Sequence, residues 1–214
     1  MDNSLSVEQA VQTLLERLSE STGWKLLKSQ RCLKKTVGEL VFEVDFYTSK
    51  WNKSNEYVGV NAGFSVWNKS YDKRLSVNSI VASKMLTPKG EQWFDITTQQ
   101  KLDSVCDELN EMIGQTAVSL ADLFEKDRVS AVKKLVDEHF FEYNVHIDYA
   151  AQVLGNDAVM QRAQEICDSL SDKVRQQIPD YKNGAKSAAW MLNRGNLRYI
   201  IDNRLIEISR VSRQ

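Results

Sequence analysis

The chain has 214 residues, a net charge of −1, and 42% hydrophobic and 27% charged residues, which is typical of a folded globular protein with one full core or two modest domains. It contains no apolar run of the ~20 residues that a membrane span needs, and its first residues lack the basic start and apolar stretch of a signal peptide. We therefore expect a cytoplasmic protein with no membrane partner. Cys32, Cys106 and Cys167 are far apart, which predicts buried free thiols rather than a disulfide framework or a metal site.

Charge is distributed unevenly along the chain. Residues 1–90 carry 13 Lys and Arg against 9 Asp and Glu, residues 91–172 carry 6 against 17, and residues 173–214 carry 9 against 3. An acidic middle segment between two basic ones can attract a basic partner, or the segments can neutralise one another within the fold.

The first predicted element is a helix over about 7–20, with an apolar stripe at a period of 3.6 residues. Ser6 followed by Gln9 forms a capping box at its start, and Gly23 lies where the chain leaves the helix. The stretch from Trp24 to Thr36 predicts one or two short strands.

Two stretches of alternating apolar and polar residues, about 39–49 and 57–66, predict neighbouring antiparallel strands. The face expected to be buried carries Phe42, Val44, Phe46, Val60, Ala62 and Phe64. The other face is expected to be an exposed polar surface with Glu43, Asp45, Tyr47, Asn61 and Ser65. If the chain turns near residue 53, Tyr47 lies opposite Gly59 and Asp45 lies opposite Asn61.

A six-residue motif occurs twice, as Ser-Lys-Trp-Asn-Lys-Ser at 49–54 and as Ser-Val-Trp-Asn-Lys-Ser at 65–70. Trp51 and Trp67 beside lysines are typical of platforms for single-stranded nucleic acid. A hairpin would place the two copies at opposite ends of the sheet, where each Trp closes an end and Asn52 and Asn68 serve the turns. We favour this second interpretation.

Further strands are expected at about 77–86 and 91–96, and Thr97 with Gln100 predicts a capping box for a helix that ends near Gly114. Helices are then expected at about 117–126, 128–141, 147–154, 157–177 (closed by Pro179), 185–193 and 197–208. Strands followed by helices indicate an α+β fold, with an N-terminal helix packed on an antiparallel sheet and an all-helical C-terminal half. We expect an α+β domain over 1–114 and a helical domain or subdomain over 115–214.

The segment from Arg31 to Phe64 resembles a bacterial domain family of unknown function, family 4304. The similarity lies in Lys34-Lys35, in Ser49-Lys50-Trp51-Asn52 and in Val60-Asn61-Ala62-Gly63-Phe64, which follow one another in the order and spacing of that family. It covers about residues 5–110. The resemblance implies a compact α+β domain in a cytoplasmic bacterial protein and carries no established catalytic residues.

No phosphate loop, metal cluster or catalytic triad is present in the sequence, so we expect no cofactor, no metal and no catalytic residue. The leading hypothesis is a non-enzymatic protein-binding module, such as an immunity protein that neutralises a basic toxin domain. Its partner surface would be either an acidic helical face with Asp107, Glu108 and Glu111 or the polar sheet face with Trp51 beside it.

Two other functions stay open. One is a hydrolase or nucleic-acid-processing enzyme in which Glu43 and Asp45 act as an acid–base pair, with Tyr47 and Asn61 positioning the substrate. The other is nucleic-acid binding through the lysines near the tryptophans and the C-terminal arginines. We do not expect nucleic acid as the partner, because the acidic middle segment opposes the approach of phosphates.

Overall fold

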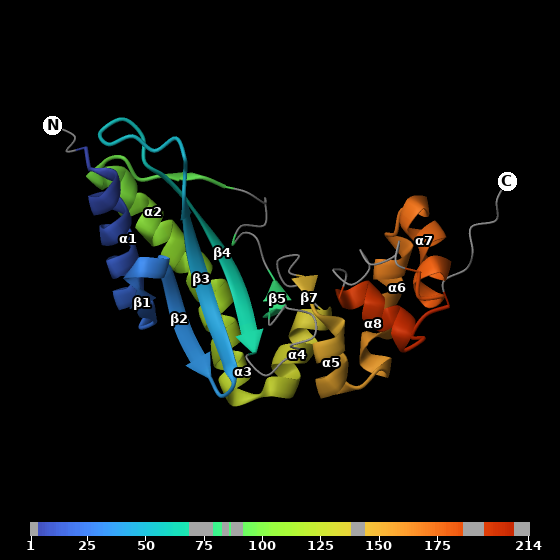
Figure 1. The fold of residues 1–214 in the computed structure, drawn as a ribbon. Helices are drawn as coiled ribbons and strands as arrows, with labels where there is room; N and C mark the ends of the chain where they lie inside the picture. The colour runs from blue at the N-terminus through green and yellow to red at the C-terminus, as the bar shows by residue number, and fades with distance from the viewer. Residues whose placement is uncertain are drawn as a thin grey trace.

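The computed structural model describes residues 4–68, 79–82, 86, 92–137, 144–185 and 195–207. Over these residues the chain has the predicted α+β fold, with an N-terminal helix, an antiparallel sheet and then a series of helices (Figure 1). The strands in this part of the chain are β1 (Lys25–Leu27), β2 (Cys32–Val37), β3 (Leu40–Thr48), β4 (Gly59–Asn68), β5 (Ser79–Ala82), β6 (Phe94–Asp95) and β7 (Asn144–Val145). The α-helices are α1 (Val7–Thr22), α2 (Gln99–Ile113), α3 (Ser119–Lys126), α4 (Arg128–Asp137), α5 (Ile147–Leu154), α6 (Met160–Asp168), α7 (Asp172–Lys182) and α8 (Gly195–Asp202).

All seven strands belong to one antiparallel sheet with the order β1-β2-β3-β4-β5-β7, and β6 pairs with the remaining length of β4. β4 is therefore the central strand, bordered by β3 on one side and by β5 and β6 on the other. The two-residue strand β7 comes from the helical half of the chain. It pairs with β5 and joins that half to the sheet.

Helix α1 begins and ends as its sequence predicts. The Ser6 hydroxyl accepts a hydrogen bond from the Gln9 amide, and the Gln9 side chain accepts one from the Ser6 amide, so both parts of the capping box are formed. Gly23 closes the helix in the left-handed region at φ 68°, where glycine is not penalised. The predicted stripe is buried at Ala10, Val11, Leu14, Leu15 and Leu18.

The β3–β4 hairpin has the predicted faces, but its predicted register is wrong by two residues. Tyr47 lies opposite Asn61, Asp45 opposite Gly63 and Glu43 opposite Ser65. The loop causes the difference, because Lys53 and Tyr57 exchange backbone hydrogen bonds and form a small turn centred beyond residue 53. A shift of two residues returns every side chain to the same face, so the division into an apolar and a polar face is kept.

The apolar face of the hairpin forms the centre of the core. All six side chains predicted for it are buried, at 4% exposure or less: Phe42, Val44, Phe46, Val60, Ala62 and Phe64. Helices α1 and α2 contact each other and cover this face (Figure 1). The Phe42 ring stacks on Phe64 with centroids 6.4 Å apart and meets Phe124 of α3 edge-on at 5.6 Å.

Helix α2 begins one residue later than predicted. Thr98 is its N-cap and accepts a hydrogen bond from the Lys101 amide, because Thr97 is held by Asp95 and Val58 instead. At its other end, α2 does not stop at Gly114. A π-helical turn over Gly114–Val118 carries it into α3, so the expected domain boundary falls within a continuous helical segment. One cluster of buried side chains extends from α1 to α8.

The helical half follows the predicted order with two corrections. The helix predicted over 157–177 is divided into a 3-10 turn (Asp157–Val159), α6 and α7, because Ser171 adopts an extended backbone between the two helices. Pro179 lies inside α7 and does not end it. The helix expected at 185–193 falls almost entirely outside the described residues. In the part of the chain that the structure describes, no helix is both long and apolar enough to cross a membrane.

Truncation of a side chain on the apolar face should lower the free energy of unfolding much more than truncation of the next residue along the strand, which lies on the polar face. Phe46 is 4% exposed, so we expect Phe46→Ala to lower the free energy of unfolding by about 3–5 kcal/mol, measured by urea denaturation. Tyr47 is the next residue of β3 and points to the other face with 51% exposure, so Tyr47→Ala should cost less than about 1 kcal/mol. Equal losses in the two variants would contradict the assigned faces.

Candidate functional site

The polar side of the hairpin brings together the five residues predicted for it. Glu43, Asp45 and Tyr47 of β3 share one face with Asn61 and Ser65 of β4. The expected exposure is wrong for β4, however, because Asn61 is only 2% exposed and Ser65 only 8%. The Asn61 side-chain oxygen is buried with no hydrogen-bond partner.

Aromatic side chains lie along the polar face of β4. On its polar face β4 presents small residues, and neighbouring rings lie against them. The Tyr57 ring occupies the space over Gly59, where a Cβ would collide with it. The Trp67 indole donates a hydrogen bond of 2.7 Å to the Ser65 hydroxyl. The second copy of the Trp-Asn motif thus packs along the sheet.

The acids of the polar face are not arranged as an exposed catalytic pair. Lys34 of β2 donates to Glu43 at 2.7 Å and forms a half-buried ion pair with it. Burial and the nearby Glu43 carboxylate raise the pKa of Asp45, and Lys34 partly opposes this. Burial raises the pKa of the Cys32 thiol to about 11, and the carboxylates of Asp45, which lies opposite Cys32, and of Glu43 add to this effect. Cys32 is therefore protonated at neutral pH and is a poor nucleophile.

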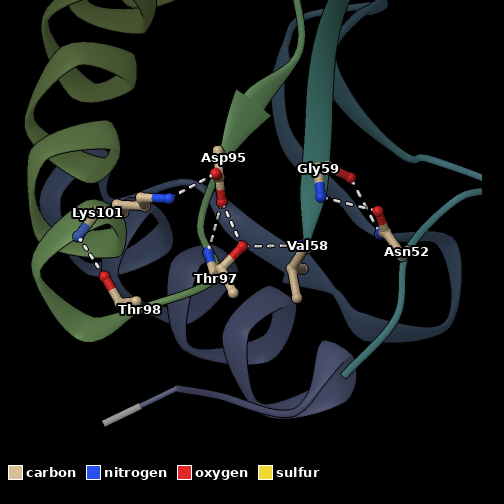
Figure 2. Close-up of polar contacts among 7 residues, drawn as sticks. All are labelled: Asn52, Val58, Gly59, Asp95, Thr97, Thr98 and Lys101. Atoms are coloured by element: carbon tan, nitrogen blue, oxygen red, sulfur yellow. Dashed lines mark hydrogen bonds and ion pairs between the residues drawn. The ribbon is translucent and has the colours of Figure 1, made fainter. Parts of the chain in front are cut away.

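The loop between β3 and β4 carries the first copy of the motif, and Asn52 fixes its shape. The Asn52 side chain accepts a hydrogen bond of 2.8 Å from the Gly59 amide and donates one of 3.1 Å to the Gly59 carbonyl (Figure 2). The Ser49 amide donates to the same carbonyl at 3.0 Å. The first part of the loop, from Ser49 to Asn52, is thus joined to the first residue of β4, and Asn52 serves the turn as predicted.

The same loop is bound to the start of α1 (Figure 1). The Asn55 amide donates to the Leu5 carbonyl at 3.3 Å, and the Ser54 hydroxyl accepts from the Val7 amide at 3.2 Å. These contacts join segments about 50 residues apart in sequence. They hold the loop against the body of the protein.

A second group of hydrogen bonds holds the segment around β6. The Asp95 carboxylate accepts hydrogen bonds from the Thr97 amide and hydroxyl and forms an ion pair of 2.7 Å with Lys101 (Figure 2). Although burial acts against it, the hydrogen bonds from Lys101 and Thr97 lower the pKa of Asp95. The Thr97 hydroxyl also accepts a hydrogen bond of 3.0 Å from the Val58 amide, which joins this segment to the end of the loop.

Between these two braced segments lies a pocket of about 530 Å³, here called the aromatic pocket. It is lined by Ser49, Lys50, Trp51, Tyr57 and Trp93. Trp51 is 74% exposed and Trp93 is 39% exposed. The Lys50 ammonium lies 5.0 Å from the centre of the Trp51 ring, which is a cation–π contact. Exposed tryptophans beside a pocket are typical of recognition sites.

The acidic face predicted on α2 is present. Asp107, Glu108 and Glu111 are exposed, while Leu102, Val105 and Leu109 are buried on the opposite side of the helix. None of these three carboxylates forms an ion pair with a described residue. The Gln92 side chain donates a hydrogen bond of 3.4 Å to Glu108, so the residue before Trp93 lies against the acidic face.

The sequence analysis missed Trp93 and Tyr57 as partners of Trp51. Trp93 is more than 40 residues from Trp51, and only the pairing of β6 with β4 brings the two together. His146, in contrast, is packed against Gly195, and His139 lies outside the described residues. The described part of the chain contains no group of three His, Cys, Asp or Glu side chains that could hold a metal ion.

The raised pKa of Asp45 gives a testable dependence of stability on pH. The folded chain holds this proton more tightly than the unfolded chain, so the contribution of Asp45 to stability is complete below its unfolded pKa. It is lost as the pH rises through its folded pKa. We expect Asp45→Asn to raise the free energy of unfolding at neutral pH and to change it much less near pH 3, where Asp45 is neutral in both states. A loss of stability at neutral pH would show that the ionised carboxylate is favourably bound.

Removal of the Asn52 side chain should loosen the loop. Asn52→Ala leaves the partly buried amide of Gly59 without its acceptor, and we expect a loss of about 1–3 kcal/mol in urea denaturation. Lys53→Ala is the control, because Lys53 and Glu56 form an exposed ion pair in the same loop, and it should cost no more than about 1 kcal/mol. If the two variants are equally stable, the Asn52 contacts do not brace the loop.

No protein-family model matches this chain, and no similar chain was found among curated proteins or among solved structures. The resemblance of Arg31–Phe64 to the family of unknown function therefore stays a prediction.

Proposed function

We propose that the protein is a non-enzymatic binding module for a basic protein and that its role is to neutralise a toxin by covering the toxin's active site. The observation that carries this proposal is the acidic face of α2, where Asp107, Glu108 and Glu111 are exposed without an ion pair to any described residue. Internal neutralisation, the alternative left open by the sequence, involves this face in part, because Asp103 and more weakly Asp107 raise the pKa of Arg17.

The chemistry of the described side chains supports binding over catalysis. Burial is the main cause of the raised pKa of Cys32, Cys106 and Cys167, which keeps each thiol protonated. Glu43 is held by Lys34. One observation favours the second candidate, a hydrolase: the raised pKa of Asp45 is the property of a general acid. Its neighbour Asn61 is buried, however, and offers no exposed group to a substrate.

The physical role of the acidic face is to speed the encounter with the partner. Exposed carboxylates contribute little to folding stability because water and salt screen them. Collected on one face, they raise the rate of association with an oppositely charged protein by ~10- to 1000-fold at low ionic strength. An immunity protein benefits from such speed, because it has to bind the toxin before the toxin acts.

The test begins with the genes beside that of this protein. Each neighbouring product with an excess of Lys and Arg is expressed with and without this protein, and growth is measured. We expect one product to stop growth alone and to be tolerated when this protein is present.

Association kinetics are then measured for the wild type and for a variant in which Asp107, Glu108 and Glu111 are replaced by Ala. The variant should keep its melting temperature and associate at least ~10-fold more slowly at low salt.

A matched variant controls for net charge. Helices α6 and α7 lie at the other end of the molecule from α2 (Figure 1). Replacement of Asp157, Asp168 and Asp180 by Ala removes the same number of exposed carboxylates from this segment and should leave the association rate nearly unchanged. If both triple variants slow association equally, only the net charge matters. If neither does and added salt has no effect, the acidic face is not the partner surface.

A further inference from the structure

The aromatic pocket is the second feature of this molecule that is built for recognition. In the described residues, five large apolar side chains are exposed, and three of them, Tyr47, Trp51 and Trp93, lie at the same end of the sheet. A tryptophan side chain that stays exposed to water does not gain the large favourable free energy of burial. The structure nevertheless braces the loop of Trp51, through Asn52 and through the contacts of Ser54 and Asn55 with the start of α1.

The pocket already shows which chemistry its rings accept. The faces of tryptophan and tyrosine rings carry negative electrostatic potential and attract cations. The Lys50 ammonium uses this property at 5.0 Å from Trp51, although its side chain is exposed and could point into solvent. Lys50 is exposed and forms no ion pair with a described residue, so a cation that binds the ring more strongly can displace it.

The surroundings of the pocket also favour a cation. The Gln92 side chain donates a hydrogen bond to Glu108, so the residue before Trp93 contacts the acidic helix α2. A basic protein surface can bury one cationic side chain against the aromatic rings while other cations of that surface pair with the acids of α2. A nucleic acid would place its phosphates near the same carboxylates and be repelled.

We infer that the aromatic pocket is the anchor site for one arginine or lysine side chain of a basic partner protein, which takes the place of Lys50 against Trp51 and Trp93. The choice of partner rests on the proposed function. The acidic face attracts the partner over a distance, and the pocket holds it after contact. Hot spots of interfaces are characteristically such aromatic pockets filled by a single side chain.

The test uses small probes on the intact protein. N-acetyl-arginine amide is titrated against the protein while the indole N–H signals are followed by NMR, with N-acetyl-citrulline amide as the uncharged probe of nearly equal shape. We expect saturable shifts at Trp51 and Trp93 and none at Trp24, which is 3% exposed. Arginine should bind about 2- to 30-fold more tightly than citrulline, the range that a cation–π contact supplies.

Variants assign the binding to the pocket. Trp51→Ala removes an exposed ring, so the protein should stay folded and arginine binding should be lost. Lys50→Met removes the competing ammonium but keeps the length of the side chain, and it should tighten arginine binding. Lys53→Met removes a charge from the same loop outside the pocket lining and should change binding less.

The inference is overturned if citrulline binds as well as arginine, if Lys50→Met weakens binding, or if a short oligothymidylate shifts Trp51 and Trp93 more strongly than arginine does. The last outcome would assign the pocket to nucleic acid. These titrations contain no partner, so they are independent of the proposed function. If arginine does not bind the pocket but the triple acidic variant associates more slowly with the toxin, the toxin-binding proposal stands and the pocket inference is wrong. If arginine binds but the triple variant associates at the wild-type rate, the pocket binds cations and the proposed partner is wrong.

Discussion

The structure depends on one hydrophobic contact, between the apolar face of the β3–β4 hairpin and the helices α1 and α2. Phe42, Val44 and Phe64 are nearly inaccessible to solvent and pack against Leu14, Leu18 and Leu102 within the same core cluster. Burial of this area is the main favourable contribution to folding, because apolar surface is removed from water on both layers at once. It also fixes which side of the hairpin faces outward. The polar residues of β3 and β4 and the exposed face of α2 consequently lie on opposite sides of the molecule.

That separation limits what each surface can do. The polar sheet face and the acidic face of α2 cannot form one continuous binding surface, since the core lies between them. The end of the sheet is different. There the β3–β4 loop and the segment around β6 meet the beginning of α2, and Gln92 contacts Glu108. Gln92, the residue before Trp93 of the aromatic pocket, is thus a contact between this end of the sheet and the acidic face.

The predicted elements illustrate which local signals are reliable. α1 was predicted within two residues at each end because a capping box, an apolar stripe and a glycine all agree. The hairpin faces were predicted correctly because side chains alternate with a period of two. Its register was not, because the loop forms a turn of its own between Lys53 and Tyr57 that no alternation reveals. Thr97 and Thr98 are equally good N-caps by type. Asp95 and Val58 hold Thr97 in the structure, and this leaves the role to Thr98.

The sequence by itself determined the α+β class, the apolar faces of α1, α2 and the hairpin, and the acidic outer side of α2, because each follows from a periodicity within one element. Tertiary structure decided which polar residues are accessible. Asn61 and Ser65 are buried on the central strand β4, along which the Tyr57 ring lies over Gly59 and the Trp67 indole donates a hydrogen bond to Ser65. It also decided that Trp51 and Trp93 share a pocket, since strand pairing between distant segments leaves no trace in local sequence. Burial on a polar face and proximity across the sheet are properties of packing, and no single strand encodes them.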